Sequence, residues 1–207
     1  MNSYTKFASL YDGLMNEDID YSIWADYIEN MFDFFDRSPG IVCDLACGTG
    51  NMTLPLARRG YDMIGVDKSF DMLSIARSKA AEEKLDVMFL EQDLSKLDLY
   101  GGCDAFLCMI DGFNSMVNPN TLCTIAKRIR TCFMEPGAIF IFDISSEYKL
   151  KNYIGNNTFI HDGDKVFYTW ENKFRDKIKM SDMYLNFFVK NGGTYTRFGY
   201  RHLQRAY

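Results

Sequence analysis

The chain has 207 residues, of which 47% are apolar and 25% charged, and these values are typical of one globular domain with a substantial core. Its net charge is −5 and its pI about 5.1, so the whole chain has no electrostatic footprint for nucleic acid or an anionic membrane, and we expect neither as a partner. No run approaches the ~18 apolar residues of a membrane-spanning helix. Residues 1–12 lack the apolar core of a signal peptide.

Cysteine and histidine usage argues against a disulfide framework and against a metal centre. None of the six cysteines forms a C-x-x-C pair, and four lie in segments predicted to be buried strands or strand edges. Only two histidines are present, so a histidine-rich metal site is not expected. We therefore expect reduced thiols, no bound metal and a cytoplasmic protein.

The chain is predicted to begin with two helices, which form an N-terminal helical cap over residues 1–38. Apolar residues recur at helical spacing within residues 4–15 and again within residues 21–35. The second helix is expected to end before Pro39.

The second predicted helix is rich in aromatic residues. We expect Tyr27, Phe32 and Phe35 to pack in the core. Tyr21 and Trp24 lie in its first turn, where core packing and contact with a neighbouring ligand are equally compatible with their position.

Residues 41–51 are the stretch around which the rest of the chain is organised. A β-favouring apolar run is followed by Asp44, by a cluster of small residues, and by a helix-compatible segment from Asn51 onward. This order is typical of a buried strand, a tight turn and a helix entry. Gly48 and Gly50 can adopt positive φ and let a ligand approach the backbone. The free N–H groups of the helix start face the same gap.

Four further strand-like segments follow and are separated by helical segments. The predicted strands cover residues 61–67, 87–90, 104–110 and 138–143. One helix is expected to end near residue 59, a second to begin after Ser69 as N-cap, and a third to cover residues 121–133. Apolar strands that alternate with helices predict an α/β, Rossmann-like, doubly wound and mostly parallel sheet.

Acidic residues stand at or near the carboxyl end of every predicted strand of this sheet. They are Asp44, Asp67, Asp93, Asp111 and Asp143. Ligands of doubly wound sheets bind at that edge, at the topological switch point. Solubility alone would not place acids at one edge, so we predict the ligand site there.

From residue 156 onward the pattern changes to successive strands. Residues 158–160, 165–174, 178–190 and 194–202 resemble strands separated by turns. We predict an appended antiparallel β meander over residues 156–207, which serves as a lid or substrate wall beside a core of residues 1–155.

The residues at the strand ends favour S-adenosylmethionine (SAM) over a dinucleotide. A dinucleotide loop reads G-x-G-x-x-G, whereas this turn has Ala46 and begins with Asp44, an acid that suits an ammonium group better than a pyrophosphate. Asp67 can accept hydrogen bonds from two ribose hydroxyls. Asp93 and Leu94 suit an exocyclic amine and the face of an adenine ring.

Ordered motifs run along almost the whole chain. They are Tyr4-x-x-Phe7-Ala8-x-x-Tyr11-Asp12, Tyr21-x-x-Trp24, Asp44-Leu45-Ala46-Cys47-Gly48-Thr49-Gly50, Asp111-x-x-Asn114, Phe140-Ile141-Phe142-Asp143-Ile144 and His202-Leu203-Gln204-Arg205-Ala206-Tyr207. Together they resemble the class I SAM-dependent methyltransferases, and specifically a small bacterial subgroup. The resemblance implies methyl transfer from SAM to a small-molecule acceptor with a nitrogen or oxygen nucleophile.

The resemblance also implies a set of cofactor contacts, in which the small-residue turn cradles the methionyl part of SAM. The expected contacts are Tyr21, Trp24, Asp44, Ala46, Cys47, Gly48, Gly50, Asn51, Asp67, Lys68, Met72, Gln92, Asp93, Leu94 and Met109. Residues after the fourth strand are implied to face the transferred methyl group.

Two features depart from the subgroup. It usually has acids before the final histidine, where this chain has Tyr200 and Arg201, so no role is carried over from those acids. The family sheet has seven strands, whereas this sequence stops after the meander at what resembles a helix entry. We therefore expect the C-terminal part to be missing, and the exposed edge of the fifth strand to be covered by a partner or by the meander.

Catalysis of methyl transfer depends mainly on alignment and a dry site, so no base constellation is required. Asp111 is a candidate to orient or deprotonate an amine, with a turn or helix-cap role as the alternative. Asn114 is a weaker candidate of the same kind. His202 is a candidate base, with a structural role as the alternative.

Two other function classes stay open at this stage. One is a catalytically silent SAM-binding regulator, which would keep the cofactor residues and lack an acceptor pocket. The other, less favoured by the loop pattern, is a nicotinamide-dependent oxidoreductase. The sequence identifies neither the acceptor nor the oligomeric state.

Overall fold

The computed structural model describes residues 8, 10, 12, 13, 15 and 19–207, and these divide into two compact units. The parallel unit comprises residues 8–112 and 119–143. The antiparallel unit comprises residues 113–118 and 144–207. The predicted helix over residues 4–15 lies largely outside the described residues, and the predicted boundary between residues 155 and 156 stays a prediction.

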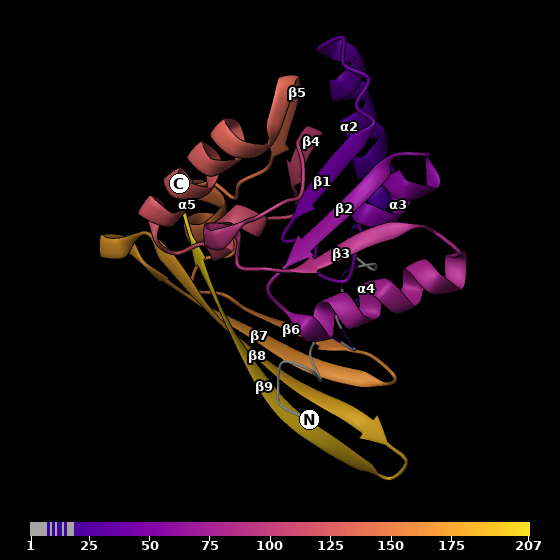
Figure 1. Cartoon of the computed structure of the whole chain (residues 1–207). Coiled ribbons are helices and arrows are strands. Elements are labelled where there is room, and N and C mark those ends of the chain that lie inside the picture. The colour runs from indigo at the N-terminus through magenta and orange to yellow at the C-terminus, as the bar shows by residue number, and fades with distance from the viewer. Residues whose placement is uncertain (1–7, 9, 11, 14, 16–18) are drawn as a thin grey trace. The chain divides into compact units, whose positions relative to one another are not determined.

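The parallel unit contains the predicted Rossmann-like sheet, with five parallel strands in the order β3-β2-β1-β4-β5 (Figure 1). The strands are β1 Ile41–Leu45, β2 Asp62–Asp67, β3 Val87–Glu91, β4 Cys103–Cys108 and β5 Met134–Phe142. The helices are α2 Tyr21–Phe34, α3 Thr53–Arg58, α4 Phe70–Glu83 and α5 Pro119–Arg128, with the short turns η1 Leu94–Lys96 and η3 Ile129–Phe133. The strand order reverses between β1 and β4, which makes this pair the topological switch point.

Local capping chemistry fixes where the helices begin. Asp20 caps α2, because its Oδ1 accepts a hydrogen bond of 2.9 Å from the backbone N–H of Ser22. Ser69 caps α4 as predicted, since its Oγ accepts from the N–H of Met72 at 3.3 Å. The latter cap lies directly after β2, so it fixes the chain at the edge where the ligand site is expected.

The fifth strand begins earlier than predicted. β5 starts at Met134 and includes Pro136, although a turn was expected there. Proline is tolerated because β5 lies at the edge of the sheet, and its pairing with β4 shifts register between Cys103 and Ala105. The meander forms a separate sheet, and the covering of the β5 edge by the meander or by a partner stays a prediction.

The antiparallel unit contains the predicted meander, a four-stranded sheet in the order β6-β7-β8-β9 (Figure 1). The strands are β6 Thr158–Asp162, β7 Val166–Arg175, β8 Met180–Asn191 and β9 Thr194–Arg205. The unit also contains η4 Lys149–Tyr153 and η5 Asp176–Ile178, and η2 Gly112–Ser115 crosses from one unit to the other.

A row of aromatic rings crosses all four strands on one face of the meander. The register places His161 opposite Tyr168, Tyr168 opposite Phe187, and Phe187 opposite Phe198. Successive ring centroids lie 4.9, 5.6 and 5.1 Å apart. Cross-strand aromatic pairs of this kind fix the register of the sheet.

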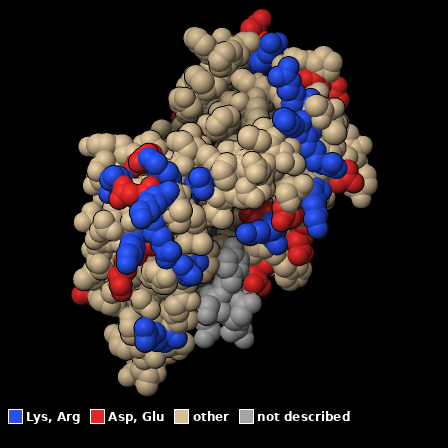
Figure 2. All heavy atoms as spheres, turned by 90° about the vertical axis from the view of Figure 1, so that its left-hand side faces the viewer, with Lys and Arg blue, Asp and Glu red and all other residues tan. Residues whose placement is uncertain are grey.

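The opposite face of the meander carries a charged cluster around Asp182. Arg201 donates two hydrogen bonds of 2.7 Å to the two oxygens of the Asp182 carboxylate, and Arg175 pairs with the same group. The hydrogen bonds from Arg201 hold the pKa of Asp182 below its usual value. On the face that Figure 2 presents, Lys and Arg side chains lie next to Asp and Glu side chains in several places. Arg201 therefore neutralises an acid of its own sheet.

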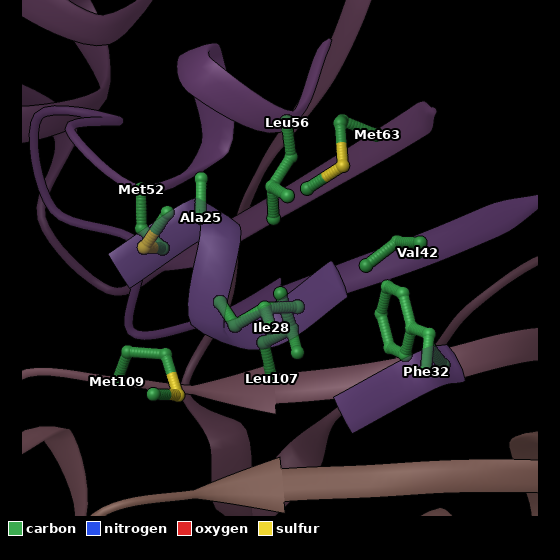
Figure 3. Close-up of a cluster of buried hydrophobic side chains, with 10 residues drawn as sticks. Ala25, Ile28, Phe32, Val42, Met52, Leu56, Met63, Leu107 and Met109 are labelled. Atoms are coloured by element: carbon green, nitrogen blue, oxygen red, sulfur yellow. The ribbon is translucent and has the colours of Figure 1, made fainter. Parts of the chain in front are cut away.

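A cluster of buried apolar side chains packs α2 and α3 onto the parallel sheet (Figure 3). Ala25, Ile28 and Phe32 of α2 lie on one helical face and are at most 2% exposed. The prediction of core packing was wrong for Tyr27 and Phe35, which are 50% and 53% exposed. Tyr27 points away from that face, and Phe35 lies beyond the last residue of α2.

The structure describes all six cysteines and joins none of them in a disulfide, and the four that were predicted to lie in buried strands or strand edges are buried. In the part of the chain that the structure describes, no helix is long and apolar enough to cross a membrane. Within the same residues, no group of histidine, cysteine and acidic side chains has a geometry that could hold a metal ion.

Candidate functional site

The carboxyl edge of the parallel sheet gathers the acidic residues around the switch point. Asp44 is the last but one residue of β1, and Asp67 is the last residue of β2. Asp93 and Asp111 follow β3 and β4, the strands that flank this central pair in the sheet order. The predicted arrangement of acids at one edge is therefore present.

The small-residue turn after β1 uses left-handed backbone at three positions, with φ of +57° at Ala46, +56° at Gly48 and +77° at Gly50. A Cβ added at Gly48 would meet nothing within 4 Å, so the backbone there borders open space. A Cβ at Gly50 would lie 3.2 Å from the Cβ of Ala76, so this part of the turn presses against α4. One glycine leaves room for a ligand, and the other permits close packing.

Asp67 joins the turn to the end of β2. Its Oδ2 accepts the backbone N–H of Gly48 at 3.0 Å, and its Oδ1 accepts the N–H of Ser69 at 2.8 Å. Burial raises the pKa of Asp67, and these two hydrogen bonds oppose the shift. Each carboxylate oxygen keeps a further lone pair, so the group fits a pair of neighbouring hydroxyl donors.

Asp44 is the most buried acid of this edge, with 2% of its surface exposed. Its Oδ2 accepts a hydrogen bond of 2.5 Å from the hydroxyl of Thr53. Burial raises the pKa of Asp44 to about 7, and the charge of Asp67 adds to the shift. A cation bound beside this carboxylate would favour its ionised form. The bond of Thr53 to Asp44 was not predicted from the sequence.

The residues after β3 are organised by side-chain bonds to the backbone. The amide of Gln92 donates to the carbonyl of Asp98 and accepts from its N–H, both at 2.8 Å. Asp93 accepts the N–H and the hydroxyl of Ser95, and the hydroxyl bond is the main reason why the pKa of Asp93 is lowered. Leu94 is buried, whereas Lys68 after β2 is exposed.

The predicted aromatic and methionine contacts pack against the core. Tyr21 and Trp24 are partly buried against the cluster of Figure 3, and Met109 belongs to it. Met72 is buried in the first turn of α4. Burial raises the pKa of Tyr21, while a hydrogen bond with Asn51 of the turn opposes the shift.

The turn after β4 holds two non-glycine residues in the left-handed region. Ile110 has φ of +58° and Asp111 has φ of +60°. Such backbone costs about 1–3 kcal/mol per residue and is uncommon for a β-branched side chain. The N–H of Asp111 donates to Oδ2 of Asp143 at 3.0 Å, so the acid after β5 helps to fix this turn. Asp111 is therefore held in one conformation at the edge of the sheet.

The other two catalytic candidates belong to the antiparallel unit. Asn114 is fully buried, and its amide donates to the carbonyls of Ser145 at 3.0 Å and Arg205 at 2.7 Å and accepts from the N–H of Ser145 at 2.8 Å. His202 lies on β9 opposite Met183, half-buried, with its ring 6.1 Å from that of Tyr200.

A further polar group beside the turn was not predicted. Asp12 and Lys79 contact each other and also Asn51, although they lie 67 residues apart in the chain. The only signal for Asp12 was its place in the N-terminal motif. Lys79 has no sequence signal, because a lysine on a helix is usually solvated.

Comparison with known proteins gives a family match over the segment that contains the acids at the ends of β1 to β4. The family model described as a methyltransferase domain matches residues 42–137. The candidate methyltransferase YqeM of Bacillus subtilis (strain 168) is 32% identical over 206 residues, which cover 99% of this chain and 80% of that protein.

Solved structures agree with this result. A SAM-dependent methyltransferase from Clostridium acetobutylicum ATCC 824 is 39% identical, with a TM-score of 0.88 over 100% of this chain and 82% of that one. The fold also matches SAM-bound CalS10, an amino pentose methyltransferase from Micromonospora echinaspora, with a TM-score of 0.75 at 14% identity over 96% of this chain and 82% of that one.

Proposed function

Because this chain belongs to the class I SAM-dependent methyltransferases, we propose that the carboxyl edge of its parallel sheet binds SAM beside a small-molecule acceptor with a nitrogen or oxygen nucleophile. The observation that carries the placement is the bond from the Gly48 N–H to Asp67, since it closes the turn around open space at the switch point.

The residues of this edge fit the chemical groups of SAM. Asp67 suits the ribose hydroxyls, because its oxygens retain lone pairs. Asp44 suits the α-ammonium, because a buried carboxylate gains most from a nearby cation. The segment of Asp93 and Leu94 suits the adenine. Tyr21 and Trp24 suit the sulfonium, to which aromatic faces offer ~0.5–2 kcal/mol of cation–π attraction.

SAM, when bound, supplies a methyl group activated by its sulfonium. The task left to the protein is alignment, which is worth up to about 7–11 kcal/mol in well-oriented reactions. Asp111 is proposed to orient the nucleophile or to accept its proton, because its turn fixes the backbone that carries the carboxylate. His202 is proposed as a base. Asn114 is proposed to be a positioning residue, since its amide binds three backbone groups and holds the chain segments of Ser145 and Arg205 together.

The acceptor is proposed to be a small molecule, with no nucleic acid or membrane surface as partner. The acidic chain offers little general attraction to a polyanion. A cytoplasmic location is part of this proposal, and six cysteines outside any disulfide fit a reducing compartment.

A pair of experiments tests the function. Calorimetric titration with SAM and with NADH separates the proposed activity from that of a nicotinamide enzyme, and we expect binding of SAM alone. Incubation with methyl-labelled SAM and a metabolite pool should then label a small molecule. Binding of NADH without SAM would overturn the proposal, and binding of SAM with no labelled product in any pool would favour a silent regulator.

A further inference from the structure

A group of four polar side chains, here called the Asp12 cluster, joins the N-terminal segment to the cofactor turn. Asp12 Oδ1 accepts from the hydroxyl of Thr49 and from Nδ2 of Asn51, the latter at 2.9 Å. Asp12 Oδ2 accepts from Nζ of Lys79 at 2.7 Å. Lys79 also donates to Oδ1 of Asn51 at 2.6 Å. Each member therefore contacts at least one other member through a polar bond.

The four residues come from three separate parts of the parallel unit. Asp12 lies among the described helical residues before α2, and Lys79 lies on α4. Thr49 and Asn51 flank Gly50, the position at which the turn presses against Ala76. The cluster thus contacts the two residues on either side of this glycine.

The Asp12 cluster is one of three attachments that define the shape of the turn. The first half of the turn is held by the hydrogen bond from the Gly48 N–H to Asp67. The helix entry that follows the turn is held by the hydrogen bond from the Thr53 hydroxyl to Asp44. Both of these attachments lead to strand-end acids. The Asp12 cluster holds the residues between them, and Asp12 is the only part of these three attachments that precedes α2.

The charges of the cluster are compensated and partly shielded. The side chains of Asp12 and Lys79 are 25% and 24% exposed, so water weakens their attraction less than that of an open surface pair. A cavity of about 420 Å³ adjoins the cluster and is lined by Tyr21, Leu54 and Glu83 among others. Hydrogen bonds and an ion pair therefore attach Asp12 beside this cavity.

We propose that Asp12 is a positioning residue for the cofactor, because it fixes Thr49 and Asn51, with Lys79, in the conformation that binds SAM. This proposal rests on the proposed SAM site. Loss of the cluster frees the middle of the turn while its two ends stay attached, so the cofactor dissociates faster.

The test compares SAM dissociation rates and affinities of the full chain by stopped-flow and calorimetry. Asp12→Asn keeps the size of the side chain but places an amide against the Lys79 ammonium. Lys79→Met removes the cation and keeps the aliphatic stem. Each is expected to raise the dissociation rate and the Kd of SAM about fivefold or more, as for loss of a hydrogen bond to a charged group. The double variant should be no weaker than the worse single variant, because both remove one cluster.

A matched control lies in the same cavity. Arg58 and Glu83 form an ion pair between α3 and α4 and line the cavity without contacting Thr49 or Asn51 in any hydrogen bond described. Arg58→Met and Glu83→Gln are expected to change the Kd of SAM by less than about twofold. A fivefold loss in these controls as well would overturn the specific role of Asp12.

The outcome is separable from failure of the proposed function. If wild type binds no SAM, the proposed function fails; if wild type binds SAM and Asp12→Asn stays within twofold in Kd and dissociation rate, the inference alone fails. If Asp12→Asn melts at a clearly lower temperature than wild type, the test uses Lys79→Met and Thr49→Val instead. The inference fails if the Kd and the dissociation rate of SAM stay within twofold of wild type in both variants.

Discussion

Asp44 is deeply buried and has a pKa near neutrality. We therefore predict that the affinity of the protein for SAM depends on pH. Burial raises the pKa of Asp44 from 3.8 to about 7, so much of the cofactor-free protein carries a protonated Asp44 below pH 7. Binding of a cation beside it requires ionisation. The Kd of SAM should therefore fall as pH rises from about 6 to about 7.5, by up to tenfold per unit below the pKa.

Asp44→Asn provides the control for that pH dependence, since it keeps an acceptor for Thr53 but cannot ionise. Its Kd should be weaker at pH 7.5 and should lack the part of the pH dependence that is due to Asp44. The sign for stability is opposite: a raised pKa in the folded state makes this carboxyl lower the free energy of unfolding as pH rises from about 4 to about 7. An equal pH profile in wild type and variant would contradict the assignment.

Two substitutions of Asp111 distinguish the effect of its backbone conformation on stability from the effect of its carboxylate on methyl transfer. Asparagine tolerates the left-handed region, so Asp111→Asn should fold and bind SAM like wild type and lose methyl transfer. Asp111→Ala should in addition lose about 1 kcal/mol of unfolding free energy, because alanine is disfavoured at positive φ. Thermal melting and initial rates check the pair, and an unimpaired rate in Asp111→Asn would remove the carboxylate from the mechanism.

Single residues also show where sequence reasoning ends. The acids at the strand ends were predictable, because a parallel sheet brings the ends of its strands to one edge. Asp12 and Lys79 were not, since a contact across 67 residues follows from the packed fold and not from local pattern. The roles of the predicted cofactor residues stay proposals until binding is measured.

At the scale of the elements, we predict that the buried carboxylate of Asp182 stabilises the meander. Asp182 is 1% exposed at its side chain and is paired with Arg175 and Arg201. Asp182→Asn should lower the unfolding free energy by about 1–3 kcal/mol at pH 7, because two guanidinium groups lose their charged partner while half exposed. Urea unfolding measures this, with Glu171→Gln on the same face of β7 as the control.

Asp182 should also make the stability of the meander fall at acidic pH. Its pKa is lowered in the folded state by Arg201 and then Arg175, so its stabilising effect is present above 3.8 and is lost as pH falls through the lowered pKa. Wild type should lose more stability than Asp182→Asn below pH 4. A parallel loss in both proteins would show that the carboxylate is not ionised in the native meander.

Elements with strong local signals were predicted well, and those decided by sheet position were not. The strand–turn–helix stretch of residues 41–51 and the Ser69 cap follow from glycine and capping chemistry. β5 was shortened in the prediction because Pro136 resembles a turn, whereas a strand at the edge of the sheet accommodates a proline. Likewise, helical periodicity alone did not show which side of α2 faces solvent at Tyr27.

At the scale of the whole molecule, the chain joins a parallel unit to an antiparallel meander. The SAM-dependent methyltransferase from Clostridium acetobutylicum ATCC 824 matches the fold over 100% of this chain. It spans 80% of the length of YqeM, and the expectation of a missing C-terminal part stays an expectation. No residue pattern of the chain identifies the acceptor, because methyl transfer needs alignment rather than a fixed set of acids and bases.

The central claim is that SAM binds at the carboxyl edge of the parallel sheet, and Asp67 tests it most directly. SAM is titrated by calorimetry into wild type, Asp67→Ala, and Asp62→Ala, which alters the exposed acid at the opposite end of β2. We predict at least a tenfold weaker Kd for Asp67→Ala, from ~1.5–3 kcal/mol per hydrogen bond to a charged group, and no change for Asp62→Ala. An unchanged Kd in Asp67→Ala would contradict the account.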